Sequence, residues 1–561
     1  MSRQRQEGSP VSIPSASFGI ALQTFAALLW LPQAALLAWV AQRLAAGQAG
    51  LDWLALIGGS FLVLALARAA ADAWGVRLSY ARARAQVGER RRAGLRALAG
   101  ASPFDARRVA AGAAASALAE QAEAITPYLT RYRAARVKVQ VVPLALAAAV
   151  ACVSWLAALI LVFTAPLIPI FMALVGWRAQ AASEAHLREL GSLNAYVLDR
   201  LRGLASLRGL GALAYTRRRL RALSQSLRIR TMAVLRIAFL SSAVLELFSA
   251  LGVALVAVYV GFHLLGQLPF GAWGASLSLG QGVFVLLLAP AFFEPLRELA
   301  SVWHDRAAGE AGEAALAALG REVLPLPGGA SAAAPAAGAR VPPEVRLDAV
   351  SFAYPGHASA PLREFSLELA AGGHLAITGD SGAGKSTLLA LVAGLLAPDS
   401  GRVLIQGETL HGANAARLRA RMAWVGQRPH FFAATLGGNV RLGRPGVDAA
   451  AVRRALGLAH LDLVAERRGA ARLGEGAAGL SGGEAVRLAI ARAAADPACD
   501  LILADEPTAH LDRATADAVI DSLLALGEGR TLLVATHDPR LVARLGCSVE
   551  LADPAPRAEA A

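Results

Sequence analysis

The sequence predicts two domains of different kinds: an all-α transmembrane domain with six helices, followed by an α/β domain. The chain has 561 residues, whereas single hydrophobic cores stop growing at about 250–300 residues. The mean hydropathy is +0.47 and only 17% of the residues are charged, which is more apolar than a soluble protein of this size requires. Short apolar β-like runs alternate with helical patterns only in the C-terminal part, which favours an α/β sheet there.

Six apolar runs are long enough to cross a bilayer, which takes about 20 helical residues. The third and fourth runs nearly touch at Ser154 and Trp155, so a tight turn must join them. The runs are Phe18 to Val40, Leu54 to Trp74, Val137 to Val153, Leu156 to Trp177, Met232 to Phe262 and Leu277 to Phe293. We therefore expect a multi-pass membrane protein embedded in a lipid bilayer.

The basic residues indicate how the chain is oriented in the membrane. Arginines crowd into residues 77–136 and 178–236, which lie between the second and third and between the fourth and fifth runs. The positive-inside rule places both segments, and the N-terminus, in the cytoplasm. Both segments are also rich in Ala and Leu, so we expect helices that continue the membrane spans into the cytoplasm.

The net charge of +14 does not indicate nucleic-acid binding, because the arginines follow membrane topology and form no single stripe. Of 55 basic residues only Lys138 and Lys385 are lysines, so we expect these two at positions that arginine cannot serve. The three cysteines are widely spaced and predict neither a disulfide framework nor a zinc site.

A change in composition marks the boundary between the two domains. Residues 319–343 are rich in Pro, Gly and Ala, a composition that cannot build a packed core. We therefore expect a transmembrane domain over residues 1–318, a linker over 319–343 and the α/β domain over 344–555.

A glycine-rich loop carries the clearest chemistry of the α/β domain. Residues 379–387 read GDSGAGKST, follow the strand-like HLAIT and precede a helical run, which is the context that a P-loop requires. Backbone N–H groups around Gly382 and Gly384 can curl around phosphates, Lys385 can reach the β and γ phosphates, and Ser386 can hold Mg²⁺. The loop predicts that this domain binds a nucleoside triphosphate.

A second motif lies downstream of this loop. The apolar run Leu501 to Ala504 ends in Asp505 and Glu506, which is the form of the strand that follows a P-loop in such enzymes. Asp505 is then expected near the metal and Glu506 as the general base that polarises the attacking water. By itself the pattern is equally typical of an ordinary strand end, and the P-loop upstream favours the catalytic interpretation.

The segment Leu480 to Glu484, LSGGE, resembles the signature motif of ATP-binding-cassette (ABC) proteins, with Glu484 where glutamine is usual. Further family elements follow in order: Tyr354 for adenine stacking, Gln427 for the Q-loop, Asp512 for the D-loop and His537 for the switch. Six spans ahead of a cassette resemble an ABC exporter, so the resemblance implies an ATPase coupled to transport, with ATP and Mg²⁺ as cofactors. The implied residues are Glu506, His537, Gln427 and Lys385 for catalysis; Tyr354, Gly379, Asp380, Ser381, Gly382, Ala383, Gly384, Lys385, Ser386, Thr387, Gln427, Asp505, Ser481, Gly482, Gly483 and Asp512 for nucleotide; and Ser386, Gln427 and Asp505 for metal.

The transmembrane part is similar to one branch of these exporters. The strings at residues 164–176, 198–208, 235–248 and 292–299 look like CydD-type subunits of CydDC exporters. That resemblance implies pairing with a CydC-type half in the bacterial inner membrane, and export of cysteine or glutathione, or movement of haem, in support of cytochrome bd assembly. A lipid, drug or peptide exporter of the same fold is the alternative, while a soluble cassette ATPase is disfavoured by the six spans.

Several residues of the transmembrane part are candidates for cargo binding. Glu246 lies within the fifth run, where an ionisable group is either functional or a carboxylate paired inside the bundle. The spacing of Glu294 and Arg297 predicts a pair on one helix face. Residues that follow the second and sixth runs could bring an imidazole, aromatic rings and guanidinium groups together at the inner mouth of the cavity. Such a set would suit haem, although the simpler interpretation is that these residues form a solvated helix face with a packing tryptophan. The full set of cargo candidates is Arg77, Tyr80, Arg82, Glu246, Trp303 and His304.

Overall fold

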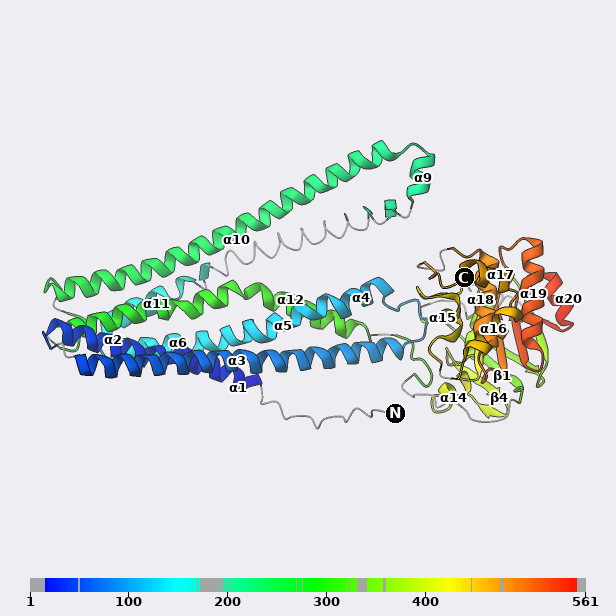
Figure 1. Cartoon of the computed structure of the whole chain (residues 1–561), viewed down its shortest axis with the longest axis horizontal. Helices are drawn as coiled ribbons and strands as arrows, with labels where there is room; N and C mark the ends of the chain where they lie inside the picture. Colours follow the sequence, from blue (N-terminus) through cyan, green and yellow to red (C-terminus); the bar gives the residue numbers. More distant parts are fainter. Residues whose placement is uncertain are drawn as a thin grey trace, which may run out of the picture. The chain divides into compact units, whose positions relative to one another are not determined.

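The computed structural model describes residues 16–551, apart from 49–50, 169, 172–192, 194–195, 198, 202, 269, 275, 322, 330–340, 357–359, 445 and 475–478. The chain divides into two compact units. Residues 1–91 and 112–316 form a helical unit, and residues 92–111 and 317–561 form a unit that contains the β-strands (Figure 1).

In the described part of the helical unit, five helices are long and apolar enough to cross a membrane, and Trp155–Thr164 is a shorter apolar helix. Most of the predicted fourth run beyond Ile168 lies outside the described residues. Within the strings quoted above, residues 169, 172–176, 198 and 202 also lie outside them. The helices are α1 (Ala16–Leu28), α2 (Trp30–Ala45), α3 (Leu51–Ala99), α4 (Ala111–Ala119), α5 (Ile125–Pro127), α6 (Arg133–Ala151), α7 (Trp155–Thr164), α9 (Leu204–Gly209), α10 (Leu213–Leu264), α11 (Leu279–Ser301) and α12 (Trp303–Ala318), with short helices η1 (Gln121–Ala124) and η2 (Tyr128–Tyr132).

Two helices extend far beyond the thickness of a bilayer. Helix α3 has 49 residues and α10 has 52, which at about 1.5 Å per residue gives roughly 75 Å each. The hydrocarbon core of a membrane is only about 30 Å thick. The predicted helical continuation of the second and fifth spans is therefore confirmed.

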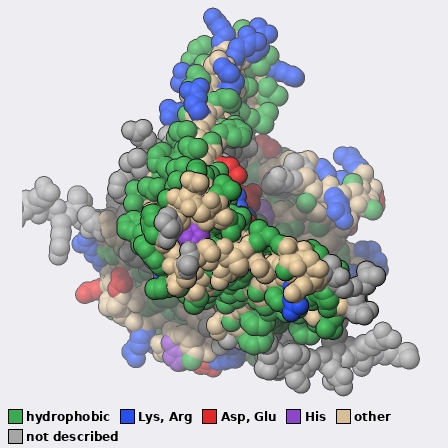
Figure 2. Space-filling model, turned by 90° about the vertical axis from the view of Figure 1, so that its left-hand side faces the viewer, with side chains coloured by type: hydrophobic (Ala, Val, Ile, Leu, Met, Phe, Trp, Pro, Cys, Tyr) green, Lys and Arg blue, Asp and Glu red, His purple; other side chains and the backbone are tan. Residues whose placement is uncertain are grey.

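The surface of the helical unit is largely hydrophobic. In the view of Figure 2, hydrophobic side chains cover most of the unit, and basic side chains gather on the part that rises at the top, the arginine-rich first half of α10. In the most apolar stretch of α3, 6% of the residues are buried inside the chain. Such a surface requires lipid or another apolar partner around it.

The turn between α6 and α7 is as tight as the sequence predicts. Ser154 caps α7, and its hydroxyl donates to the carbonyl oxygen of Gly271 at 2.7 Å. The Ser154 hydroxyl oxygen also lies 3.0 Å from the Tyr259 hydroxyl. Nearby, α10 packs closely on α11. A Cβ built on Gly252 of α10 would lie only 2.4 Å from the Phe293 ring of α11, so glycine is needed at this contact. These contacts fix the core of the bundle around fully buried Phe293.

The second unit contains two sheets. Strands β1 (Val345–Phe352), β2 (Leu362–Leu369), β4 (Ser400–Ile405) and β5 (Glu408–Thr409) form an antiparallel sheet of order β2-β1-β4-β5. Strands β3 (His374–Thr378), β6 (Met422–Val425), β7 (Leu501–Asp505), β8 (Thr531–Ala535) and β9 (Ser548–Glu550) form a parallel sheet of order β6-β7-β8-β3-β9. In parallel strands the carboxyl ends share one edge, where open α/β sheets bind their ligands.

Eight helices accompany these sheets in the described chain. They are α13 (Lys385–Val392), α14 (Ala415–Arg419), α15 (Leu436–Arg441), α16 (Ala449–Leu458), α17 (Asp462–Arg468), α18 (Gly482–Ala494), α19 (Arg513–Gly527) and α20 (Pro539–Leu545). The central strands β7, β8 and β3 are largely buried on both faces, and all residues of β8 are buried, whereas the edge strand β9 has exposed residues.

Part of the predicted linker is structured, which composition did not indicate. Leu324 donates its N–H to the buried Asp105 carboxylate at 2.5 Å, and Pro325 forms an isolated bridge with Ala101. The Ser102 hydroxyl donates to the carbonyl oxygen of Leu395 at 2.6 Å. Although burial opposes it, hydrogen bonds from Leu324 and Arg107 hold the pKa of Asp105 below its usual value. Residues 92–111 belong to the second unit for this reason.

Candidate nucleotide-binding site

The glycine-rich loop joins β3 to α13 through backbone conformations that favour glycine. Gly379, Gly382 and Gly384 have φ values of +136°, +90° and +101°. A Cβ on Gly379 would lie 2.5 Å from the carbonyl oxygen of Leu551, and one on Gly384 would lie 2.8 Å from that of Pro361. Only glycine allows both the turn and these close approaches.

Lys385 is the first residue of α13, and three elements of the sheet edge meet at its side chain. Its ammonium donates to the carbonyl oxygens of Gly379 at 2.8 Å and Asp380 at 2.9 Å. The same nitrogen lies 2.8 Å from His537 Nε2 and 3.9 Å from Glu506 Oε1. The predicted phosphate-binding lysine therefore lies beside the predicted base and the predicted switch histidine.

The carboxyl end of β7 brings the two predicted acids to the same edge. The Ser386 hydroxyl donates to Asp505 Oδ1 at 2.9 Å. Burial raises the pKa of Asp505, while Ser386 and the Lys385 charge act in the opposite direction. A hydroxyl beside a carboxylate is a donor set that suits Mg²⁺, which binds through one or two carboxylates plus phosphates and water.

Glu506 adopts a backbone conformation that is unusual for a residue with a side chain. Its φ is +47°, and its N–H donates to the carbonyl oxygen of Ala535 on the neighbouring strand at 2.9 Å. The side chain is 18% exposed, and its Oε1 lies 3.2 Å from His537 Nε2. Strained conformations of this kind persist where the surrounding structure holds them, often at functional sites.

The remaining predicted residues of the site occupy the same edge or flank the loop. The Tyr354 hydroxyl lies 3.2 Å from Thr387 Oγ1, and its ring packs edge-on against Phe352. Gln427 is exposed just after β6, whose neighbour in the sheet is β7. Asp380, Ser381 and Ala383 are loop residues between β3 and α13.

The signature segment forms the start of α18. Ser481 caps the helix in a capping box: the Ser481 N–H donates to Glu484 Oε2 at 2.7 Å, and the Glu484 N–H donates to Ser481 Oγ at 3.3 Å. The glutamate therefore performs a local structural task that glutamine can also perform. The pattern S-x-x-E is a capping signal that can be recognised in the sequence alone.

Gly482 is exposed and Gly483 buried in the first turn of α18, and Gly483 serves helix packing. A Cβ on Gly483 would lie 2.0 Å from the Thr515 side chain on α19. Asp512 caps α19 by accepting from the Thr515 N–H at 3.0 Å, and its hydrogen bonds with Thr515 lower the pKa of the carboxyl group. The N-termini of α18 and α19 carry the positive ends of the two helix dipoles, so both suit contact with an anion.

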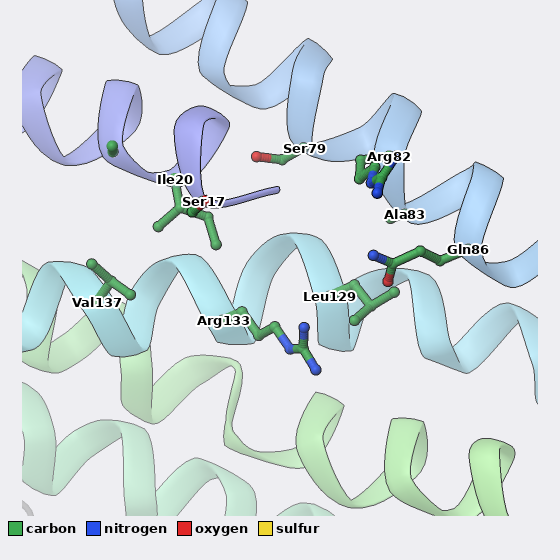
Figure 3. A pocket seen from close by; sticks show the side chains of 10 residues that line it. Ser17, Ile20, Ser79, Arg82, Ala83, Gln86, Leu129, Arg133 and Val137 are labelled. Atoms are coloured by element: carbon green, nitrogen blue, oxygen red, sulfur yellow. The ribbon is translucent and has the colours of Figure 1, made fainter. Parts of the chain in front are cut away.

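The cargo candidates of the helical unit fall into separate groups. Arg82 lines a cavity of about 330 Å³ between α1, α3, η2 and α6, with Arg133 and Gln86 also on its wall (Figure 3). Arg77 and Tyr80 are exposed on α3. No hydrogen bond, ion pair or ring contact in the described chain joins these α3 residues to Trp303 or His304.

The candidates on α10 and α12 have partners of their own. Trp303 packs edge-on against Tyr132, with ring centroids 6.0 Å apart. His304 Nε2 lies 3.1 Å from Asp305 Oδ1, and Arg297 lies 3.6 Å from Glu246. The predicted pair of Arg297 with Glu294 is present.

Two ionisable residues of the second apolar run, Arg68 and Asp72, were not among the predicted site residues. Both line a larger cavity, of about 670 Å³, inside the helical unit. The available signal was simple, since an ionisable residue inside a membrane span is a functional candidate by default.

The fold and this site define an ABC transporter, a multi-pass membrane protein whose cassette is an ATPase coupled to transport. The model of the ABC transporter family matches residues 362–509, and that of the ABC transporter transmembrane region matches residues 101–287. Over 95% of its length the chain superposes on 92% of a bacterial Atm1-family ABC exporter solved with ATP bound, with a TM-score of 0.71 and 23% identity, a likeness of fold.

The chain belongs to the CydD-type ATP-binding/permease proteins within the ABC transporters. It is 36% identical to the glutathione/L-cysteine transport system protein CydD of Haemophilus influenzae and 38% identical to that of Escherichia coli, in each case over 76% of this chain and 72% of the relative. It is also 33% identical to the CydC protein of the same transport system in Bacillus subtilis, over 73% of this chain and 70% of the relative.

Proposed function

We propose that this chain is one half of a heterodimeric exporter that pairs with a CydC-type half and moves cysteine or glutathione out of the cytoplasm. The observation that carries the proposal is the sequence identity of 36–38% to proteins named for glutathione and L-cysteine transport. The arginine-rich segments support a bacterial inner-membrane protein with the N-terminus and the cassette in the cytoplasm. Residues 1–318 would form the transport pathway, 319–343 the connection and 344–555 the cassette.

In the cassette, the loop from Gly379 to Thr387 would bind the phosphates of ATP and Tyr354 would stack on the adenine. Glu506 would orient the attacking water, and His537, 3.2 Å away, would hold the Glu506 carboxylate in place. Lys385 would neutralise charge on the transferred phosphate. Ser386, Asp505 and Gln427 would hold Mg²⁺, which neutralises phosphate charge when bound.

The partner would complete each ATP site. Ser481, Gly482 and Gly483 at the start of α18, and Asp512 at the start of α19, would contact ATP that is bound to the loop of the opposite half. The phosphate-binding loop of one chain and the helix N-termini of the other would then enclose one nucleotide, so that neither half works well alone.

Haem is a second candidate cargo, and its support is the set Arg77, Tyr80, Arg82, Trp303 and His304. Two observations weaken it: His304 already lies 3.1 Å from Asp305, and Arg82 lines a cavity with Arg133. A lipid, drug or peptide cargo remains the alternative for an exporter of this fold.

The test is ATP-driven uptake by inverted vesicles that contain the chain together with its CydC-type partner. Labelled cysteine and glutathione should accumulate, and the accumulation should require ATP and disappear in Glu506→Gln. Uptake of haemin, dyes or lipids without uptake of either thiol would refute the proposal. Haemin-stimulated ATPase activity that is lost in His304→Ala would favour the haem alternative.

A further inference from the structure

The larger cavity of the helical unit has the size and lining of a small-molecule site. Its volume of about 670 Å³ falls within the range of ligand pockets, roughly 300–1,000 Å³. Apolar walls such as Phe61 and Leu146 surround a few polar groups. The ionisable residues of the lining are Arg68 and Asp72 from α3, Lys138 from α6, and Glu294, Arg297 and Glu298 from α11.

Four of these ionisable residues have partners among themselves or on a neighbouring helix. The Lys138 ammonium donates to both Glu298 oxygens, at 3.1 and 3.3 Å. Arg297 pairs with Glu294 and lies 3.6 Å from Glu246 of α10. These charges are neutralised within the protein.

Arg68 and Asp72 are different. The Arg68 guanidinium donates to the Gln33 side-chain oxygen at 3.4 Å and lies 5.4 Å from the Trp30 ring centroid. Among the residues that the structure describes, neither Arg68 nor Asp72 forms an ion pair. A charge within a membrane span is costly without a partner, so a cation and an anion left in one cavity indicate a ligand that carries both charges.

The surroundings of Arg68 hold its side chain in place. Gln33 is 2% exposed, and the Trp30 indole N–H donates to the carbonyl oxygen of Leu287 on α11 at 3.2 Å. Residues 68 and 72 are one helical turn apart, so their side chains project from the same face of α3, with Cβ atoms about 5–6 Å apart. That spacing suits a ligand whose two charged groups are separated by a single carbon atom.

We propose that Arg68 and Asp72 form a clamp for the α-amino-acid head group of the cargo, with Arg68 binding the carboxylate and Asp72 the ammonium. The inference rests on the proposed export of cysteine or glutathione. The γ-glutamyl linkage of glutathione leaves the α-carboxylate and α-ammonium of its glutamate free, so one clamp serves both thiols. Arginine can grip a carboxylate through two parallel hydrogen bonds.

The charge balance of the cavity agrees with a zwitterion. Its lining has three cationic and three acidic side chains, and neither histidine nor cysteine is among the described residues that line it. Haem, which carries two propionates and needs a ligand for iron, fits this lining less well than an amino acid. The clamp therefore assigns the cavity to the thiol cargo.

The first test uses ligands alone, so it does not depend on the folding of variants. The paired complex is reconstituted in phosphatidylcholine vesicles, whose quaternary headgroup has no N–H to donate to Asp72, and uptake of labelled cysteine is measured against competitors. Cysteamine lacks the carboxylate and N-acetylcysteine lacks the ammonium, and each should compete at least about tenfold more weakly than cysteine. Equal competition by cysteine, cysteamine and N-acetylcysteine would overturn the clamp.

The second test pairs variants with ligands. Arg68→Gln should raise the half-saturating cysteine concentration about tenfold and abolish the preference for cysteine over cysteamine. Asp72→Asn should instead abolish the preference over N-acetylcysteine. Arg92→Gln and Glu89→Gln, exposed on the same helix, are the matched controls and should behave like wild type.

All four variants should elute as intact paired complexes in size-exclusion chromatography, which shows that each is folded. Wild-type transport of cysteine and glutathione with unaltered ligand preferences in Arg68→Gln and Asp72→Asn would overturn the clamp and leave the proposed function standing. A wild-type complex that transports neither thiol would refute the proposed function itself.

Discussion

The proposed role of Glu506 can be tested with a substitution that changes charge but scarcely changes shape. Glu506→Gln keeps the side-chain volume and the backbone hydrogen bond from Glu506 to Ala535, so the strained φ of +47° remains supported. It removes the negative charge that lies 3.2 Å from His537 Nε2 and 3.9 Å from Lys385 Nζ. The glycine-rich loop that is proposed to bind phosphate is untouched, so ATP should still bind.

The expected loss is that of a positioned general base, about 10²- to 10⁴-fold in turnover, which corresponds to about 3–5 kcal/mol in the activation free energy. Phosphate release by the paired complex and equilibrium binding of labelled ATP should be measured side by side. The matched control is Glu466→Gln, an exposed acid on α17 of the same unit. Turnover within threefold of wild type would refute the assignment of Glu506 as base, and loss of ATP binding would point to a structural role instead.

Three further outcomes are expected. Glu484→Gln should leave thermal stability and ATPase activity unchanged, because glutamine preserves the capping box, whereas Glu484→Ala should cost about 1 kcal/mol of unfolding free energy in denaturant titrations. Gly483→Ala should cost about 1–3 kcal/mol in the same titrations, since the new methyl group would lie 2.0 Å from Thr515; an unchanged midpoint would contradict the packing role. The purified single chain should be a poor ATPase that its CydC-type partner activates, and full cargo-stimulated turnover without the partner would argue for a homodimer.

Much of the architecture could be predicted because its signals are local in the sequence. A membrane span needs a continuous apolar run, and a P-loop needs glycines at fixed positions between a strand and a helix. The structure accordingly has the long helices α3 and α10, and it brings Lys385, Glu506 and His537 together at one sheet edge. That convergence follows from the parallel order of β3, β7 and β8.

The remaining features depend on contacts between distant segments, which composition does not encode. The glycine- and proline-rich stretch looked like a free linker, yet Leu324 donates to the Asp105 carboxylate across more than two hundred residues of sequence. The role of Gly483 depends on Thr515 of another helix. Arg68 and Asp72 were visible in the second apolar run, but only the structure shows that both line one cavity.

The two lysines of this arginine-rich chain lie where a compact ammonium is useful. Lys385 donates to two carbonyl oxygens within its own loop, at 2.8 and 2.9 Å. Its ammonium is a compact point charge, whereas the guanidinium of arginine is a broader planar fork. Lys138 is 14% exposed and donates to both oxygens of Glu298 at the wall of the larger cavity. One lysine thus lies in the proposed ATP site and the other beside the proposed cargo clamp. Because Lys138 is paired with Glu298, Arg68 is the cation available to a carboxylate. An arginine at 138 would extend a broader, forked group into the same cavity, so the choice of lysine is consistent with a space kept for a small zwitterion.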